Sequence, residues 1–238
     1  IPTSRVVEDL EKLGWLPVDA KQRMSRKKGT SRFSKHMVVF QNPDIQVKGS
    51  EGDTALPQII LVNSHDGLSS FKFMVGIYRM VCSNGLIVAD SEFANFKIRH
   101  MGYSFEELQE VVLKAVEDLP SRVKVLNDMK SKVLTLEEKQ DLALKAMLIR
   151  AGVNPESEQA KEVQYDEETL ADILEPLRKE DEEEDLWTVF NIVQEKVIRG
   201  GFYAALKGAK VRKVRAVKSF EKSIKVNQEL FKVATAMV

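Results

Sequence analysis

The stretch from Gln58 to Gly102 reads QIILVNSHDGLSSFKFMVGIYRMVCSNGLIVADSEFANFKIRHMG, and it predicts a series of short β-strands. Its first apolar run, Gln58–Val62, is too short for a helix, and the Asp66-Gly67 pair that follows is a strong hairpin signal. Apolar residues then alternate along Phe71–Ile77, and the intervening positions are also fairly apolar, which is typical of a central strand buried on both faces. An antiparallel sheet is therefore the predicted centre of the fold.

The residues on either side of this first hairpin extend the predicted sheet and add a helix. Ser4 to Leu13 has helical spacing, with Ser4 as the expected N-cap and Gly14 placed to end the helix. The segment that follows from Trp15 is expected to begin extended and to become a loop at Gly29. The further strands expected are Phe33–Gln41, Leu86–Ala89 and Phe96–His100.

Helical spacing replaces strand alternation at Ser104. Ser104 with Glu107, and Thr135 with Glu138, have the spacing of capping boxes, and Pro120 is expected to end the first helix of this half. Further helices are expected from about Arg122, Thr135, Leu170, Asp185 and Ser219.

These patterns together predict an α+β fold, in which an N-terminal helix and a mainly antiparallel β-sheet backed by helices precede a helical C-terminal part. Residues 1–134 are expected to form a β-sheet core domain with flanking helices. Residues 135–238 are expected to form a helical region that contains an acidic linker and a basic segment. A chain of 238 residues is long enough to bury a substantial core.

The composition, the lengths of the apolar runs and the first residues indicate a soluble protein of the cytoplasm. No apolar run approaches the roughly 20 residues that span a bilayer, and the first residues, IPTSRVVEDL, lack the pattern of a signal peptide. We therefore expect no membrane contact. Cys82 is the only cysteine, which excludes an internal disulfide and a thiolate metal cluster and favours a buried thiol.

The net charge is zero, but the charges are segregated along the chain. Two basic runs, from Lys21 to Lys35 and from Lys207 to Lys225, flank an acidic tract that extends from Glu156 to Asp185. Dispersed Lys and Arg side chains bind backbone phosphates, and exposed aromatic rings stack the bases of single strands. The aromatic residues beside the two runs are Trp15, Phe33, Phe202 and Tyr203. The residues expected to bind nucleic acid are Lys21, Arg23, Arg26, Lys27, Lys28, Arg32 and Lys35 in the first run and Lys210, Arg212, Lys213 and Arg215 in the second.

The sequence gives a weaker indication of an enzyme than of nucleic-acid binding. The sequence contains no P-loop, no HExxH zinc motif and no GxSxG elbow, so we expect no cofactor, no metal and no catalytic residue. A histidine together with Asp66, Asp90 and Glu92 is the one set that we would test as a nuclease site. The dipeptide His65-Asp66 fits a turn more economically, because Asp accepts hydrogen bonds from nearby backbone N–H groups.

Four motifs occur in order along the chain: VNSHDG from Val62, YRMVCSNGLIV from Tyr78, DLWTVFNIVQEKVIRGG from Asp185 and VNQELFKVA from Val226. Together they resemble an uncharacterised family, the domain of unknown function number 932, which occurs in prophages, phages and conjugative plasmids. The resemblance covers nearly the whole chain. It implies a mobile-element setting and brings no assigned activity.

The expected order of helix, antiparallel strands and long helix is also similar to the core of the Rad52/RecT/Redβ group of single-strand annealing proteins. Those proteins bind DNA without ATP in a basic groove and assemble as rings or helical filaments. This similarity implies an ATP-independent single-stranded DNA-binding protein that acts in recombination as an oligomer, with strand annealing as the activity to test. Two alternatives stay open: a metal-dependent nuclease, and an anti-defence protein whose acidic tract mimics DNA and binds a host protein.

Overall fold

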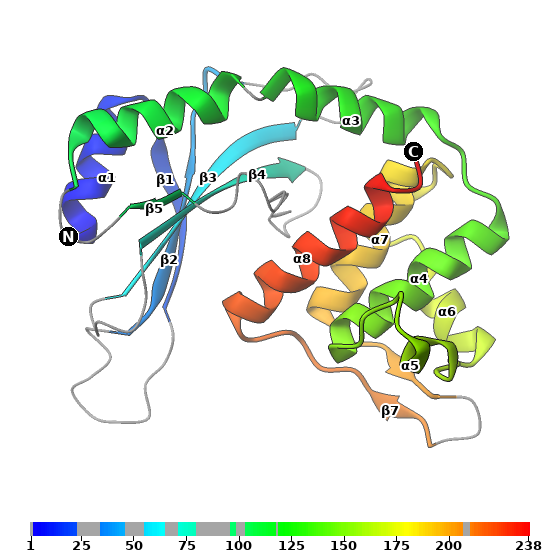
Figure 1. The fold of residues 1–238 in the computed structure, drawn as a ribbon. Helices are drawn as coiled ribbons and strands as arrows, with labels where there is room; N and C mark the ends of the chain where they lie inside the picture. The colour runs from blue at the N-terminus through cyan, green and yellow to red at the C-terminus, as the bar shows by residue number, and fades with distance from the viewer. Residues whose placement is uncertain are drawn as a thin grey trace. The chain divides into compact units, whose positions relative to one another are not determined.

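The computed structural model describes residues 2–22, 34–45, 55–64, 71–79, 96–98, 103–117, 119–206 and 210–238. They belong to two compact units, 1–123 and 124–238 (Figure 1). The division falls within helix α3, Leu119–Ser131, ahead of the boundary at residue 134 drawn from the sequence. The expected α+β fold is confirmed, because an N-terminal helix and an antiparallel sheet precede a helical C-terminal part.

The first unit is built on a sheet in which each strand pairs antiparallel with the next strand along the chain. The predicted hairpin between β3 and β4 is confirmed, and so is the position of β4 inside the sheet. The extended segment after Trp15 is a full edge strand, which the sequence indicated only in part. The predicted strand Leu86–Ala89 lies outside the described residues. The strands are β1 Leu16–Gln22, β2 His36–Gln41, β3 Ala55–Asn63, β4 Phe71–Arg79 and β5 Phe96–Ile98.

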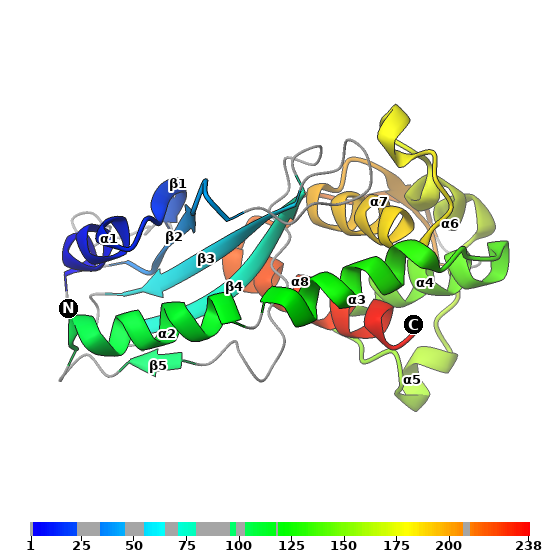
Figure 2. The same cartoon turned by 90° about the horizontal axis from the view of Figure 1, so that it is seen from above.

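Two helices, α1 Thr3–Lys12 and α2 Phe105–Glu117, pack on one face of this sheet (Figure 2). The register places Phe40 opposite Ile59 and Leu61 opposite Phe73, so these rings and aliphatic chains share that face. Residues at i, i+4 spacing on each helix complete the core. The core comprises Val6, Leu10, Trp15, Phe40, Ile59, Leu61, Phe73, Leu108, Val111 and Val112.

In the second unit, α7, Leu186–Arg199, is the central helix. Every residue from Leu186 to Val197 is buried, and the helix packs against its neighbours α4, α6 and α8. Phe190 stacks on Trp187 and meets the edge of Phe231, with ring centroids 6.1 and 5.9 Å apart. The other elements of this unit are α4 Leu136–Ala151, α5 Glu158–Lys161, α6 Glu167–Leu174, the 3₁₀ turn η2 Lys179–Asp181, β6 Tyr203–Ala204, β7 Arg212–Lys213 and α8 Phe220–Thr235.

Helix ends follow the capping residues closely. Thr135 and Glu138 form the predicted capping box. The side chains of Asp185 and Ser219 cap α7 and α8, the two helices that were expected to begin near these residues. Two assignments were wrong. Pro2, not Ser4, is the N-cap of α1. Pro120 lies in the first turn of α3 instead of ending α2, because a first-turn residue needs no backbone N–H donor.

None of the described helices is long and apolar enough to cross a membrane.

Candidate nucleic-acid interface

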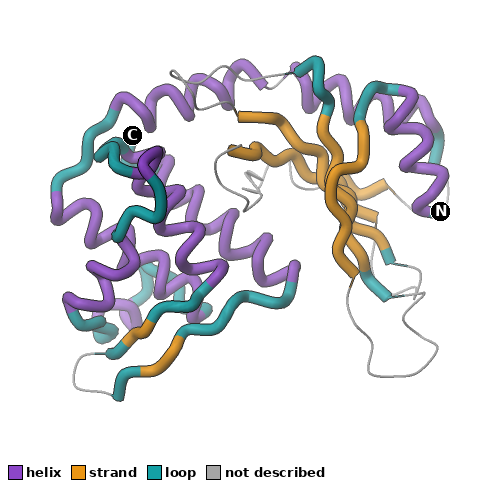
Figure 3. Tube along the Cα trace, turned by 180° about the vertical axis from the view of Figure 1, so that it is seen from behind, coloured by secondary structure: helices purple, strands orange, loops and turns teal. Residues whose placement is uncertain are grey.

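Arg212 and Lys213 of the second basic run form β7, which pairs antiparallel with β6 in a short ribbon after α7 (Figure 3). We call the described residues 200–206 and 210–217 the basic hairpin. Its register places Lys213 opposite Tyr203 and Arg212 opposite Ala204. Because successive strand side chains point to opposite faces, Lys213 and Tyr203 share one face and Arg212 lies on the other.

The hairpin starts at a glycine that no other residue can replace without strain. Gly200 ends α7 with φ +63°, in the left-handed region. A Cβ built on it would lie 2.6 Å from both the carbonyl carbon of Arg215 and the carbonyl oxygen of Val214. The return segment therefore packs directly on the backbone of Gly200. Main-chain hydrogen bonds of 2.8 Å join Gly201 N to Val214 O, Val214 N to Phe202 O and Val217 N to Ile198 O.

Arg150, near the end of α4, ties the hairpin to the helices. Its guanidinium donates hydrogen bonds to the main-chain carbonyls of Val197 on α7 and Arg215 on the hairpin. Burial lowers the pKa of Arg150, and it also raises the pKa of the nearby Tyr165 phenol. A guanidinium stays charged even so, because its ordinary pKa is far above neutrality.

The outgoing strand is held by α6 and the segment before it. The Ala205 amide donates to Thr169 Oγ1, and the Asp166 amide donates to Ala205 O, both over 3.1 Å. Phe202 and Ala205 are buried. Both strands of the hairpin are thus fixed by hydrogen bonds of their own main-chain atoms. The side chains other than those of Phe202 and Ala205 can therefore face the solvent.

Four of those side chains are cationic. Lys210, Arg212, Lys213 and Arg215 are all exposed, and within the described part of the chain no carboxylate forms an ion pair with any of them. Tyr203 is 58% exposed, and Lys213 Nζ lies 5.9 Å from the centroid of its ring. The hairpin can therefore offer unpaired cations and one aromatic ring to a polyanion.

The first basic run is described only at its two ends. Lys21 is exposed in the edge strand β1 and lies 3.5 Å from Asp19 Oδ2, and Lys35 is half-buried just before β2. The remaining predicted residues of that run, Arg23, Arg26, Lys27, Lys28 and Arg32, lie outside the described residues.

Two of the aromatic residues beside the basic runs are part of the core. Trp15 is 2% exposed and Phe202 is 4% exposed, so neither offers a ring to a base. Trp15 packs in the core formed by α1, α2 and the sheet, where burial of an indole is favourable. Phe33 lies outside the described residues, so Tyr203 is the one of these four aromatic residues that the structure shows to be exposed.

The nuclease alternative gains no site from the described residues. They contain no group of three or more His, Cys, Asp or Glu side chains arranged to hold a metal ion. His36 is engaged with Thr3 Oγ1 at 2.7 Å and with the carbonyl of Ser34 at 3.1 Å. The carboxylates proposed for this site, Asp66, Asp90 and Glu92, lie outside the described residues, as do His65 and His100.

The acidic tract is a packed part of the second unit rather than a linker. Its predicted short helix is confirmed as α6, with Ile173 fully buried. Asp185 caps α7 by accepting hydrogen bonds from the Thr188 amide and hydroxyl. The tract differs from the linker expected from the sequence because it contains α5, α6 and η2 and belongs to the second unit.

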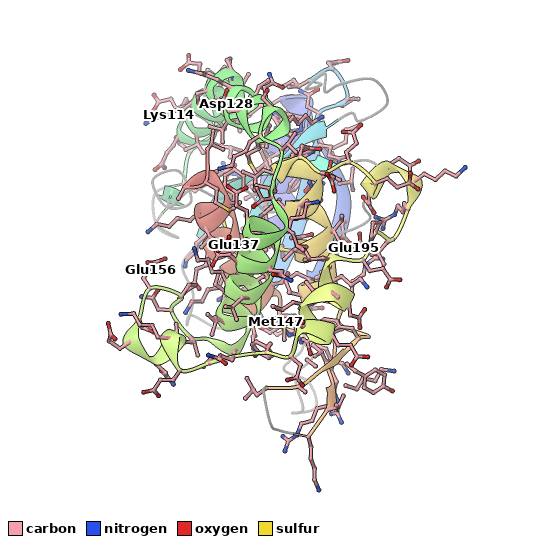
Figure 4. All side chains as sticks on the ribbon, turned by 90° about the vertical axis from the view of Figure 1, so that its right-hand side faces the viewer. Lys114, Asp128, Glu137, Met147, Glu156 and Glu195 are labelled. Carbon is pink, nitrogen blue, oxygen red and sulfur yellow. The ribbon has the colours of Figure 1, made fainter. Side chains whose placement is uncertain are left out.

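An ion-pair cluster on α7 accounts for further charges of this region. Glu195, labelled in Figure 4, is 1% exposed, and its two carboxylate oxygens accept hydrogen bonds from Nη2 of Arg178, at 2.7 and 2.8 Å. Arg199 also contacts Glu195, and Arg178 reaches Asp181 at 3.2 Å. These charges hold the 3₁₀ turn against α7.

Comparison with known proteins gives the family. Residues 1–231 match the family model described as "Domain of unknown function (DUF932)". The chain belongs to this family. The resemblance drawn from the four motifs is thus confirmed.

Two curated relatives of Escherichia coli (strain K12) span the whole chain. The UPF0380 protein YafZ is 33% identical to it over 242 aligned positions, and the UPF0380 protein YfjQ is 32% identical over the same length. Each alignment covers 100% of this chain and 81% of the relative. No solved structure matches the chain.

Proposed function

We propose that this protein of the DUF932 family binds single-stranded DNA without ATP, through the basic hairpin, and that it anneals strands as an oligomer in a recombination process of a mobile element. The cytoplasm is the compartment proposed. The observation that carries the proposal is the set of exposed cations on a fixed backbone. Lys210, Arg212, Lys213 and Arg215 have no carboxylate partner among the described residues.

The physical argument rests on counterions and on preorganisation. Each cation that neutralises a phosphate releases condensed counterions, which supplies affinity without reading the base sequence. A hairpin whose main chain is held by Arg150 and Gly200 has little backbone freedom to lose on binding. The residues Arg23, Arg26, Lys27, Lys28 and Arg32 stay predicted contributors from the first basic run.

The test is a salt titration of binding. Fluorescence anisotropy of a labelled single-stranded oligonucleotide would be measured from low to moderate salt, with EDTA present and ATP absent. The variant Arg212→Gln/Lys213→Gln/Arg215→Gln is expected to bind more weakly and to make the slope of log K against log salt shallower by about two. This value follows from about 0.7 for each lost contact with a single strand.

The matched control removes three exposed lysines of the same unit that lie outside the second basic run, Lys124, Lys179 and Lys232, each replaced by Gln. Its slope is expected to stay close to that of the wild type. Equal effects of the two triple variants would contradict a role of the hairpin. Absence of any binding at low salt would contradict the whole proposal.

Annealing and self-association need separate measurements. Complementary strands with a fluorophore and a quencher would report annealing in EDTA without ATP, and mass photometry would report the oligomer with and without DNA. A reaction that requires a divalent metal and shortens the strands would favour the nuclease alternative instead.

A further inference from the structure

We propose that Tyr203 is a stacking platform for one unpaired base, so that the hairpin discriminates single strands from duplex DNA. This inference rests on the proposed function and names the feature of the nucleic acid that the same surface recognises. Two observations support it. Phe202 is buried whereas its neighbour Tyr203 is exposed, and Lys213 lies opposite Tyr203 in the hairpin.

The contrast concerns exposure. Phe202 is buried and anchors the hairpin, whereas Tyr203, the next residue, is more than half exposed although aromatic side chains are stabilised by burial. The core therefore uses one ring and leaves the second at the surface. Val211 and Leu206 are also exposed, so apolar surface continues along the same short ribbon.

The partner of the ring across the ribbon is a cation. Lys213 lies opposite Tyr203 in the register, and its ammonium sits over the ring, 5.9 Å from the centroid. An ammonium on one face polarises the ring and leaves the other face for a planar group. A nucleotide presents a flat base and an anionic phosphate within reach of each other, which matches a ring with an adjacent ammonium.

The same chemistry explains why Tyr203 would add less to the affinity for duplex DNA. In a duplex the bases already stack on their neighbours, and their faces are covered. Only the phosphates remain for the cations of the hairpin, so the electrostatic contribution is shared by both forms and the stacking contribution belongs to the unpaired strand. Loss of the ring should therefore change selectivity, whereas loss of the cations should weaken both forms.

The experiment compares Tyr203→Phe and Tyr203→Leu for binding to a single strand and to a duplex of the same sequence. Phenylalanine retains a stacking face and is expected to keep the affinity for the single strand within about twofold. Leucine retains apolar bulk without a flat face and is expected to lose about tenfold for the single strand. Duplex affinity should change by less than about twofold in both variants.

A Tyr203→Trp variant gives an independent readout. Both native tryptophans are buried, with Trp15 2% and Trp187 1% exposed. The introduced indole would be exposed to the solvent, so a change in its fluorescence can be told from the emission of the buried pair. Stacking on a base should quench this emission on addition of single strands and leave it nearly unchanged on addition of duplex. Amide hydrogen exchange at Val214, whose N–H donates to Phe202 O, checks that the hairpin stays folded in each variant.

Two results would overturn the inference. One is an equal loss of single-strand and duplex affinity in Tyr203→Leu with an intact hairpin, and the other is no loss in either. If Tyr203→Leu binds normally while Arg212→Gln/Lys213→Gln/Arg215→Gln does not, stacking fails and the proposed function stands. If the triple charge variant also binds like the wild type, the proposed function itself fails.

Discussion

The Arg150 guanidinium on α4 donates a hydrogen bond to the main-chain carbonyl of Arg215 on the basic hairpin. Its other terminal nitrogen donates to the carbonyl of Val197 on α7. One planar cation thus joins the last turn of the central helix to the return segment of the hairpin. A residue that lies apart from the exposed cations of the hairpin therefore positions their backbone.

Replacing Arg150 should loosen the hairpin. Arg150→Met removes the donor to two carbonyls and is expected to cost about 1–3 kcal/mol in the free energy of unfolding. Arg150→Lys should recover only part of this, because an ammonium lacks the planar fork that spans both carbonyls. Urea denaturation measures the stability, and faster hydrogen exchange at Val214 and Val217 would locate the change.

The control for this prediction lies on the same helix. Lys145→Met removes a cation whose described partner is Asp141, one turn earlier, at 2.8 Å. Such surface pairs contribute less than about 1 kcal/mol. If both substitutions cost the same, Arg150 has no special role in holding the hairpin.

Gly200→Ala should be far more damaging than the same change at Gly152. Both glycines have positive φ, +63° and +86°, so both alanines carry the cost of the left-handed region, about 1–2 kcal/mol. At Gly200 the added methyl also meets the backbone of Val214 and Arg215 at 2.6 Å, whereas nothing lies within 4 Å at Gly152. We expect a loss above about 3 kcal/mol for Gly200→Ala, measured by thermal and urea unfolding. Equal losses would mean that the close contact is relieved easily.

Substitutions in the acidic tract should affect the free energy of unfolding differently, according to whether the carboxylate is buried or exposed. Asp185→Ala removes the N-cap of α7 and is expected to cost about 0.5–2 kcal/mol. Glu182→Gln/Glu183→Gln changes two exposed carboxylates in the same run and should stay within about 0.5 kcal/mol of the wild type. Urea unfolding of both variants tests this. A large loss in the double variant would show that the exposed acids are also part of the packing.

Asp9 should make the first unit sensitive to acid. Its carboxylate accepts hydrogen bonds from Lys12 Nζ and the Tyr103 hydroxyl, both at 2.8 Å. Burial raises the pKa of Asp9, but these two hydrogen bonds and the charges of Lys12 and Arg5 outweigh burial and lower it. Burial and the contact with Asp9 raise the pKa of Tyr103.

A lowered pKa in the folded state means that the unfolded chain takes up the proton first. The stabilisation by Asp9 is therefore complete above the unfolded pKa of about 4 and is lost as the pH falls below it. Asp9→Asn should cost about 1–3 kcal/mol at pH 7, and the difference from the wild type should shrink toward pH 3. Urea midpoints at several pH values test this, with Glu8→Gln, an exposed neighbour on α1, as the control. A cost for Asp9→Asn that does not depend on pH would argue against an ionised Asp9 in the fold.

The elements that could be predicted from the sequence are those with local signals. Thr135 with Glu138 marks the start of α4 by the spacing of a capping box, and Asp66-Gly67 between two apolar runs marks the connection of β3 to β4. The edge strand β1 was harder to recognise, because all its residues are exposed and it has no buried face to produce alternation.

The candidate site could be predicted in its charges but not in its geometry. The acid-poor run that contains Arg212 is visible in the sequence, yet a strand of two residues leaves no periodic signal. Arg150 was missed because it lies 65 positions from Arg215 and bonds only main-chain atoms, so no side-chain pattern links the two. Trp15 lies beside the first basic run and is nevertheless buried, because proximity to lysines along the chain does not report burial.

The way in which the hairpin is held has a consequence for how this surface can evolve. Arg150 and Gly200 contact main-chain atoms of residues 197, 214 and 215, which are the same whatever side chains those residues carry. Substitutions at the exposed positions Tyr203, Arg212 and Lys213 can therefore accumulate without loss of the frame that presents them. Homologues that keep the arginine and the glycine should be able to diverge in ligand preference while they share one backbone, and a library randomised at these three positions should remain largely folded.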